Sequence, residues 1–168
     1  KKKIQSDAMI TKLKGIALGV VTADCVPILI YDKNNDIIGC IHAGWRGAFS
    51  GIIKKTIIKI KKLGSNNKIY ASVGPCIGRK SYEVDISFYE KFVRKSKKNE
   101  IYFLKKNKKK KLFNLRKFVS DQLLRLNVIT DHLNYDTFRE KNIFFSYRRS
   151  TICKQRDYGR CISVIKLI

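Results

Sequence analysis

Two apolar segments near the start of the chain each end in residues that could bind a metal or act as a nucleophile. The first ends at Asp24 and Cys25, and the second delivers His42 just before the Gly-Trp-Arg-Gly turn at Gly44–Gly47. Cys25 and His42 lie 17 positions apart, which suits matching points of neighbouring strands joined by a turn. A thiolate and an imidazole brought together can bind zinc. Alternatively, the imidazole can activate the thiol as a nucleophile.

Arg46 and Gly47 form a second candidate site, because they sit where a helix is expected to begin. A guanidinium group and the backbone N–H groups of a helix start could together hold a phosphate or carboxylate. The alternative is a surface arginine that pairs with an acidic neighbour. Cys76, in a Gly-Pro-Cys-Ile-Gly loop, could line a pocket or simply pack beneath the turn. Arg148, after an aromatic stretch, could contact an anion or remain solvated.

The composition predicts one globular domain with a strongly basic surface. The chain has 168 residues, of which 44% are hydrophobic and 30% charged, and its formal net charge is +24. That charge would attract polyanions, but an abundance of solvated lysine explains it equally simply. No apolar run reaches the roughly 20 residues of a membrane span, and no secretory leader is recognisable. Five cysteines without a CxxC pair are typical of a reducing compartment, so we expect a cytoplasmic chain.

Strand-like and helix-like segments alternate irregularly, which favours an α+β fold with a mixed sheet covered by helices. An antiparallel hairpin would bring Cys25 and His42 to the same end. The pattern of apolar residues predicts strands at Ile16–Val21, Ile28–Tyr31, Ile37–Ile41, Ile69–Val73, Ile101–Leu104 and Arg160–Ile168. It predicts helices at Ala48–Leu63, Ile86–Val93 and Leu115–Leu126, an exposed turn at Lys105–Lys111, and a polar lead-in at Ile4–Thr11. Val128–Thr137 carries no clear pattern.

Several motifs, in order along the chain, resemble those of the YfiH/laccase-domain family, also called the polyphenol oxidase or purine nucleoside phosphorylase family. The matching segments are Asp7–Thr11, Thr22–Pro27, His42–Gly47, Gly74–Gly78, Tyr82–Val84, Phe144–Arg149 and Gly159–Arg160. The resemblance implies a single mixed α/β domain over residues 1–168 that lacks the family's N-terminal segment. It also implies phosphorolysis of adenosine, inosine or methylthioadenosine, and deamination of adenosine, in a monomer or homodimer that acts on a purine nucleoside and phosphate.

The same resemblance implies a zinc ion held by two histidines and one cysteine, and it assigns Cys25 and His42 to two of these three positions. The third is a histidine in a Gln-x-His-Gly segment ahead of Asp7, for which Lys1–Gln5 offer no counterpart. Three protein ligands would leave zinc an open position for a substrate oxygen. From chemistry alone, Arg46 is our candidate for holding phosphate, and Asp24 for orienting a ligand or moving a proton.

Three other functions compete with this one. A multicopper oxidase needs many imidazole ligands for its several copper ions. The chain has two histidines, so this function is disfavoured. A cysteine-nucleophile amidohydrolase or deamidase would use Cys25 and His42 without metal, by analogy of fold with toxin glutamine deamidases. A basic nucleic-acid-binding protein would explain the charge, although no RNA- or DNA-binding signature occurs, and nucleic acid is therefore not an expected partner.

Overall fold

A five-stranded sheet in the order β1-β4-β3-β5-β9 forms the centre of the fold. The computed structural model describes residues 6–64 and 68–168, so most of the predicted lead-in before Asp7 lies outside the described residues. All pairs are antiparallel except β5 with β9. The strands are β1 (Ala8–Thr11), β3 (Val26–Asp32), β4 (Ile37–Ala43), β5 (Ile69–Val73) and β9 (Val128–His132). The expectation of a mixed sheet covered by helices is confirmed.

The predicted hairpin is formed by β3 and β4. Pro27 pairs with His42, and Val26 with Ala43, so the start of one strand meets the end of the other. A short 3-10 turn, η1 (Lys33–Asn35), reverses the chain, and its cap is the side chain of Asp32, which accepts a hydrogen bond from the backbone N–H of Asn34 at 3.1 Å. The hairpin therefore sets Cys25 and His42 at one end of the sheet.

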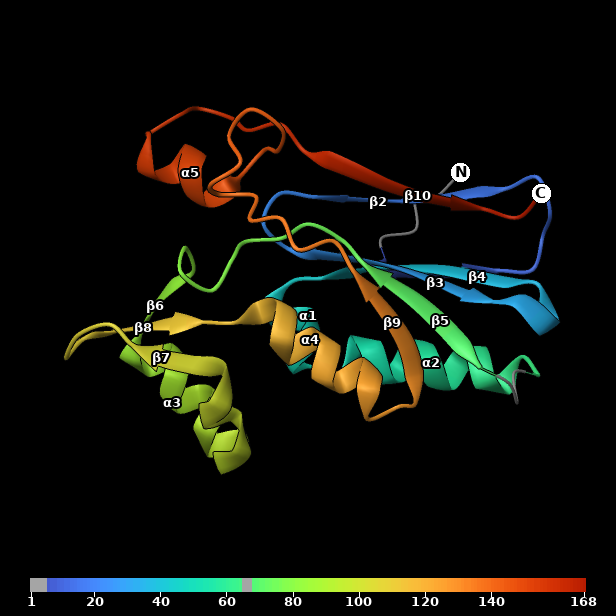
Figure 1. Ribbon diagram of the computed structural model, residues 1–168, viewed down its shortest axis with the longest axis horizontal. Helices are drawn as coiled ribbons and strands as arrows, with labels where there is room; N and C mark the ends of the chain where they lie inside the picture. Colours follow the sequence, from blue (N-terminus) through green and yellow to red (C-terminus); the bar gives the residue numbers. More distant parts are fainter. Residues whose placement is uncertain (1–5, 65–67) are drawn as a thin grey trace.

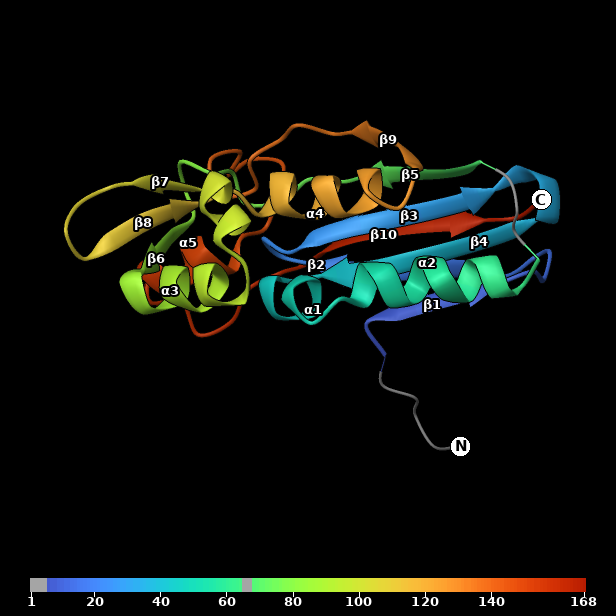
Figure 2. The same ribbon diagram turned by 90° about the horizontal axis from the view of Figure 1, so that it is seen from below.

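The two faces of the sheet are covered differently. Helices α2 (Ile52–Lys62) and α4 (Leu115–Leu124) lie against one face, and the two-stranded ribbon of β2 (Ala17–Thr22) and β10 (Cys161–Lys166) lies over the other (Figures 1 and 2). The helix side holds the larger core, with Ile28, Ile30, Ile57 and Val119 fully buried. The ribbon side holds a small cluster of buried residues: Leu18, Val20, Ile38, Cys40 and Leu167.

The single helix predicted over Ala48–Leu63 is wrong, because the chain forms two helices there. They are α1 (Trp45–Phe49) and α2, separated at Gly51, whose φ of +85° lies in the left-handed region. Glycine adopts that conformation without steric cost, and so it permits the break. Gly64, also with positive φ, follows the end of α2 as predicted.

The second half of the chain adds a small antiparallel sheet and an aromatic core. Its elements are β6 (Glu83–Asp85), α3 (Ile86–Lys95), η2 (Lys97–Tyr102), β7 (Phe103–Lys105) and β8 (Lys110–Phe113). The predicted exposed turn at Lys105–Lys111 is the connection of the β7–β8 hairpin, where the Asn107 side chain accepts from two backbone N–H groups. Stacked and edge-to-face rings of Phe88, Phe92 and Phe113 hold this sheet against α3.

The sequence pattern missed five strands or helices and placed one strand too early. The missed elements are β1, β6, β8, β9 and α5 (Tyr147–Ile152). Lys97–Tyr102 forms a 3-10 helix, so the strand predicted at Ile101–Leu104 begins only at Phe103. β9 pairs in parallel with β5, a long-range contact that local pattern does not encode. No helix in the described part of the chain is long and apolar enough to cross a membrane.

Candidate metal and nucleoside site

The side chains of Cys25 and His42 converge on one point beside Gly44. A Cβ added to Gly44 would lie 2.9 Å from the Sγ of Cys25 and 3.9 Å from the Nε2 of His42. Both donor atoms thus face the same small space, which is open only because residue 44 has no side chain. We call Asp7, Cys25, His42 and Gly44 the thiol–imidazole site.

Asp7 orients the imidazole of His42 in that site. The Nδ1 of His42 lies 3.1 Å from a carboxylate oxygen of Asp7, and the backbone N–H of His42 donates to the carbonyl of Asp7 at 2.7 Å. A proton on Nδ1, shared with the carboxylate, leaves the Nε2 lone pair available. Carboxylates commonly hold metal-binding histidines in this way. Asp7 lies at the entry to β1, so β1 helps to build the site although sequence pattern missed it.

The Cys25 thiol lies in surroundings that disfavour its ionisation. Burial first, and then the negative charges of Asp24 and Asp7, together raise its pKa to about 11. Nucleophilic cysteines usually have a lowered pKa, so the unassisted thiol does not fit that role. A thiol with nearby carboxylates suits a bound cation, whose charge would favour the thiolate.

Two donors alone do not make a complete metal site. Within residues 6–64 and 68–168, no group of three or more His, Cys, Asp or Glu side chains is placed to hold a metal ion. The pair nevertheless fits two positions of a catalytic zinc site in donor type, in convergence and in the support of His42 by a carboxylate.

Asp24 is buried and ties three segments together. One carboxylate oxygen accepts a hydrogen bond from the Thr137 hydroxyl at 2.7 Å, and the other accepts from the Ser146 hydroxyl at 2.9 Å and the Arg148 backbone N–H at 2.7 Å. Its φ of +81° turns the chain between β2 and β3, which aims the next residue, Cys25, at the site. The carboxylate is fully engaged as an acceptor, and its part in proton transfer stays a prediction.

Arg46 and Gly47 lie inside α1 rather than ahead of a helix, since the helix begins at Trp45. Arg46 is exposed and its guanidinium lies over the Trp45 ring, 4.7 Å from the centroid. Cys76 is completely buried in the core. Of the two alternatives, lining a pocket or packing beneath the Gly74–Gly78 turn, the structure shows the second. Roles for Arg46, Gly47 and Cys76 in substrate binding stay predictions.

A cavity of about 580 Å³ opens next to the thiol–imidazole site, and we call it the aromatic cavity. Trp45, Tyr82 and Phe88 supply its aromatic walls, and Trp45 directly follows Gly44. The pKa of Tyr82 is raised by burial first, and then by the negative charge of Cys25; Arg148 and Arg46 oppose this rise. Tyr82 therefore lies within electrostatic reach of the thiol and both guanidinium groups, and it links the cavity to the thiol–imidazole site.

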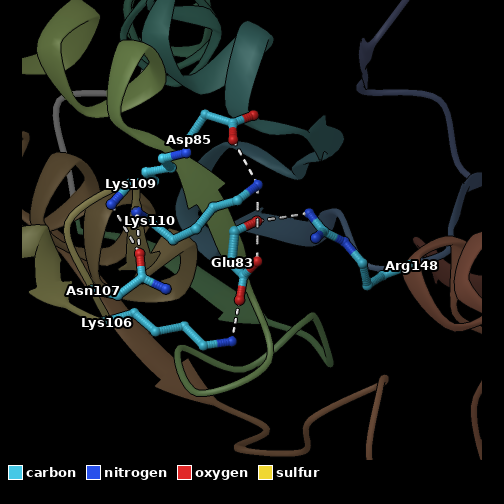
Figure 3. Close-up of polar contacts among 7 residues, drawn as sticks. All are labelled: Glu83, Asp85, Lys106, Asn107, Lys109, Lys110 and Arg148. Carbon is cyan, nitrogen blue, oxygen red and sulfur yellow. Dashed lines mark hydrogen bonds and ion pairs between the residues drawn. The ribbon is translucent and has the colours of Figure 1, made fainter.

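Several basic groups at and near the rim of the aromatic cavity are paired with acids or carbonyls (Figure 3). Lys110 lies 2.6 Å from a carboxylate oxygen of Asp85, and Lys106 forms an ion pair with Glu83. The guanidinium of Arg148 donates to the backbone carbonyl of Glu83 at 3.0 Å. The hydrogen bond from Lys106 is the main cause that lowers the pKa of Glu83. Lys91, which also lines the cavity, has no carboxylate within 4 Å in the described part of the chain and lies over the Trp45 ring, 5.3 Å from its centroid. The rim is thus neutralised in part.

Sequence reasoning missed two residues of this site. Asp7 and Tyr82 occur in segments that matched the family motifs, but no role was assigned to either. The one indication that these two residues could belong to the site was their position within the family motifs. Asp7 lies 35 positions from His42, and Tyr82 is still further along the chain from Cys25, so periodicity could not have joined them.

The chain matches, over residues 1–168, the family described as multi-copper polyphenol oxidoreductase laccase. It is 33% identical over 165 residues to a purine nucleoside phosphorylase of Haemophilus influenzae, covering 96% of this chain and 65% of the relative. A purine nucleoside phosphorylase of Rickettsia conorii is 41% identical over 100 residues, which cover 60% of this chain and 41% of the relative.

Among solved structures, the YfiH hypothetical protein of Bacillus licheniformis superposes with a TM-score of 0.87 at 28% identity, covering 97% of this chain and 62% of that one. This chain spans less than two thirds of the length of each of these three relatives. The match along the whole sequence and the shared fold agree, and the chain belongs to the laccase/YfiH family.

Proposed function

We propose that this chain forms the core of a zinc-dependent purine nucleoside enzyme that carries out phosphorolysis of adenosine, inosine or methylthioadenosine and deamination of adenosine. The observation that carries the proposal is the convergence of the Cys25 Sγ and the His42 Nε2 beside Gly44, with Asp7 on the other ring nitrogen. The names of relatives, purine nucleoside phosphorylase and, for one 40% identical over 87 residues, adenosine deaminase, support the substrate class.

Cys25 and His42 would hold the zinc, together with a third ligand from outside the described residues. Bound there, zinc would supply Lewis acidity to a substrate oxygen or to water. Asp7, 3.1 Å from Nδ1 of His42, would hold the proton on that nitrogen and so leave Nε2 free to ligate. Copper chemistry with several metal ions would need more imidazoles than His42 and His132 provide.

The aromatic cavity would bind the nucleoside. Its volume lies in the range of small-molecule sites, and its ring walls suit the flat face of a purine. Arg46 is exposed above Trp45 and lies within electrostatic reach of Tyr82, so it could meet a phosphate at the mouth of the cavity. Arg148 is the second candidate for that contact, because its guanidinium reaches the rim through Glu83.

The proposal is tested by measuring zinc content and product release in the same protein preparations. We expect bound zinc by plasma mass spectrometry, release of purine base from inosine or adenosine only when phosphate is present, and ammonia from adenosine. Cys25→Ser and His42→Gln should each lose the zinc and at least 100-fold of the rate, since both remove a ligand. His132→Gln and Cys153→Ser are matched controls that lie outside the site and should retain both.

Protein that binds no zinc and releases no base from adenosine would refute the proposal for this chain. The amidohydrolase alternative makes the opposite prediction: metal-free protein would keep an amidase activity that thiol alkylation abolishes. The raised pKa of Cys25 favours the zinc enzyme over that alternative.

A further inference from the structure

A second cavity, which we call the basic cleft, begins at Gly78, the last residue of the Gly74–Gly78 loop. Its volume is about 780 Å³, and none of the residues of the thiol–imidazole site or the aromatic cavity lines it. Its walls come from three separate segments: the loop after Gly78, the first turns of α4, and the chain that follows β9. Five cations face it: Arg79, Lys80, Arg116, Lys117 and Arg139.

The carboxylates of the basic cleft are mostly committed to other donors. Asp136 accepts from the backbone N–H groups of Gly78 and Phe138 and from the Ser81 hydroxyl, at 2.9, 3.1 and 2.7 Å. It therefore holds the cleft's own loops together and is only 3.8 Å from the Nε of Arg139. The carboxylate oxygens of Asp136 are thus occupied mainly by hydrogen bonds from the protein's own donors.

Asp121 is committed in the same way, since it accepts from the Tyr102 hydroxyl at 3.0 Å and pairs with Lys117 at 3.1 Å. Glu140 is the remaining acid. In the described part of the chain, neither Arg79 nor Lys80 has a carboxylate within 4 Å. The cleft thus keeps an excess of positive charge on exposed side chains.

Arg116 adds a cation whose position is fixed. One terminal nitrogen donates to the carbonyl of Tyr135 at 2.5 Å, and the guanidinium lies close enough to the Cys76 thiol to oppose the rise in pKa that burial causes there. Its Nε is buried, with no hydrogen-bond partner among the described residues. A guanidinium held against the wall in this way loses little entropy when it meets an anion.

The rest of the lining selects the kind of anion. Asn134 lines the cleft with its amide, the Ser120 hydroxyl donates to the Arg116 carbonyl at 2.8 Å and can still accept, and His132 contacts the Thr130 hydroxyl through Nε2 at 3.2 Å, which leaves Nδ1 for a ligand. No phenylalanine, tyrosine or tryptophan lines the cleft. Fixed cations match phosphate, and small polar side chains match hydroxyl groups. A base or other flat ring would find no stacking partner here, in contrast to the aromatic cavity.

We propose that the basic cleft binds a phosphate monoester of a small polyhydroxylated compound, that is, a sugar phosphate. This site is separate from the proposed catalytic centre and does not depend on zinc. Its cations would hold the phosphate, and its amide, hydroxyl and imidazole groups would hold the sugar.

The test is isothermal titration calorimetry of the whole chain with ribose 5-phosphate, ribose and inorganic phosphate. Ribose 5-phosphate should bind at least 10-fold more tightly than inorganic phosphate and at least 100-fold more tightly than ribose. The double variant Arg79→Gln/Lys80→Gln should weaken that binding at least 10-fold. Both side chains are exposed, so the variant should fold.

The matched control is Lys54→Gln/Lys61→Gln, which removes the same charge from the exposed face of α2 and should change the affinity less than twofold. Equal weakening in both double variants would refute the proposal, because binding would then reflect net charge alone. Binding lost in Arg46→Gln but kept in Arg79→Gln/Lys80→Gln would also refute it, by moving the ligand to the aromatic cavity. Inorganic phosphate that binds as tightly as ribose 5-phosphate, or a single-stranded RNA that binds the cleft in its place, would refute it too.

Discussion

The aromatic cavity and the basic cleft are both rimmed by lysine and arginine, and they differ in which cations lack a carboxylate partner. At the aromatic cavity, Lys110 pairs with Asp85 and the nearby Lys106 pairs with Glu83 (Figure 3), whereas Lys91 lies over the Trp45 ring. In the basic cleft, Lys117 and Arg139 pair with Asp121 and Asp136, but the adjacent Arg79 and Lys80 have no such partner in the described part of the chain. A net charge of +24 therefore does not say where an anion binds. We propose that local pairing of cations with carboxylates does, and that it separates a site for a neutral nucleoside from one for a phosphate ester.

Asp24 connects these two regions. Its carboxylate holds Thr137, the neighbour of the cleft residue Asp136, and also the backbone of Arg148, whose side chain rims the aromatic cavity. Breaking this link is the strongest way to test whether the two regions depend on a shared scaffold.

The largest effect is expected for Asp24→Ala. The substitution leaves two buried hydroxyl donors and one partly buried backbone N–H without an acceptor, and it places alanine at a φ of +81°. Since hydrogen bonds to a charged group contribute roughly 1.5–3 kcal/mol each and do not add fully, we expect a loss of about 4 kcal/mol in the free energy of unfolding. Urea denaturation measures it.

Asp36→Ala is the matched control for backbone strain. Asp36 also has a positive φ, of 48°, but it is exposed in the η1 turn. Its replacement should cost about 1 kcal/mol. Equal losses in the two variants would mean that the Asp24 carboxylate contributes nothing beyond backbone conformation.

The next effect concerns the thiol of Cys25 in the thiol–imidazole site. With a pKa of about 11, Cys25 in metal-free protein is neutral at pH 8, so it should react with iodoacetamide at least 10-fold more slowly than a model-peptide thiol. Because its pKa is raised, its rate should rise about tenfold from pH 8 to pH 9. A thiol of pKa about 8.5 rises only about threefold over that range.

Peptide mass spectrometry isolates the rate at Cys25 from that at the exposed Cys153. The pH dependence separates ionisation from access, because burial alone slows the reaction without changing its slope. A rate at Cys25 that is already level between pH 8 and pH 9 would show a lowered pKa and would revive the nucleophile alternative.

A steric test of the thiol–imidazole site compares two glycines. Gly44→Ala would place a Cβ 2.9 Å from the Cys25 Sγ, where something must shift, although its φ of −69° suits alanine. We expect a cost of about 1–2 kcal/mol and weaker zinc binding, as overpacking displaces the thiol. Gly47→Ala makes only ordinary contacts, the closest 3.5 Å from Ile52, and should stabilise α1 by up to about 1 kcal/mol.

Thermal unfolding and zinc titration of both variants distinguish the two outcomes. Unchanged zinc affinity in Gly44→Ala would show that the space beside Gly44 is not where the two donors meet a metal.

The local sequence pattern was sufficient to predict the elements that are stabilised by interactions between residues close together in the chain. The β-branched run of β3 and the turn at Asp32–Asp36 specify the hairpin, and Asn114 caps α4 with a hydrogen bond from the Lys117 N–H. Cys25 and His42 were found because this hairpin alone brings them together. That part of the site lies within one local unit.

The rest depends on contacts that no short window contains. Asp24 meets Thr137 across 113 positions, and β9 is a strand because β5 lies beside it in parallel. The basic cleft likewise assembles from three distant segments, and the lysine-rich sequence gives no sign of which cations lack a carboxylate. Contacts between residues far apart in the sequence therefore determine both which segments surround each site and which of its cations are paired with carboxylates.

The smallest expected effect belongs to the rim of the aromatic cavity, at Glu83→Gln. Exposed ion pairs contribute about 0–1 kcal/mol, and the side chain of Glu83 is 30% exposed, so the variant should lose less than 1 kcal/mol near neutral pH. The pKa of Glu83 is lowered in the folded state, so its stabilising contribution is present above the ordinary glutamate pKa of about 4.3. It is lost as pH falls through the lowered value, and the difference between wild type and variant, measured by urea denaturation, should vanish there.

The substitution also leaves Lys106 without its carboxylate partner and weakens the neutralisation of Lys110. If local neutralisation is what distinguishes the two cavities, Glu83→Gln should make the rim more like the basic cleft and raise its affinity for ribose 5-phosphate a few-fold at low salt. A variant with unchanged anion binding at the rim would show that the ion pairs are not what keeps phosphate esters away from the aromatic cavity.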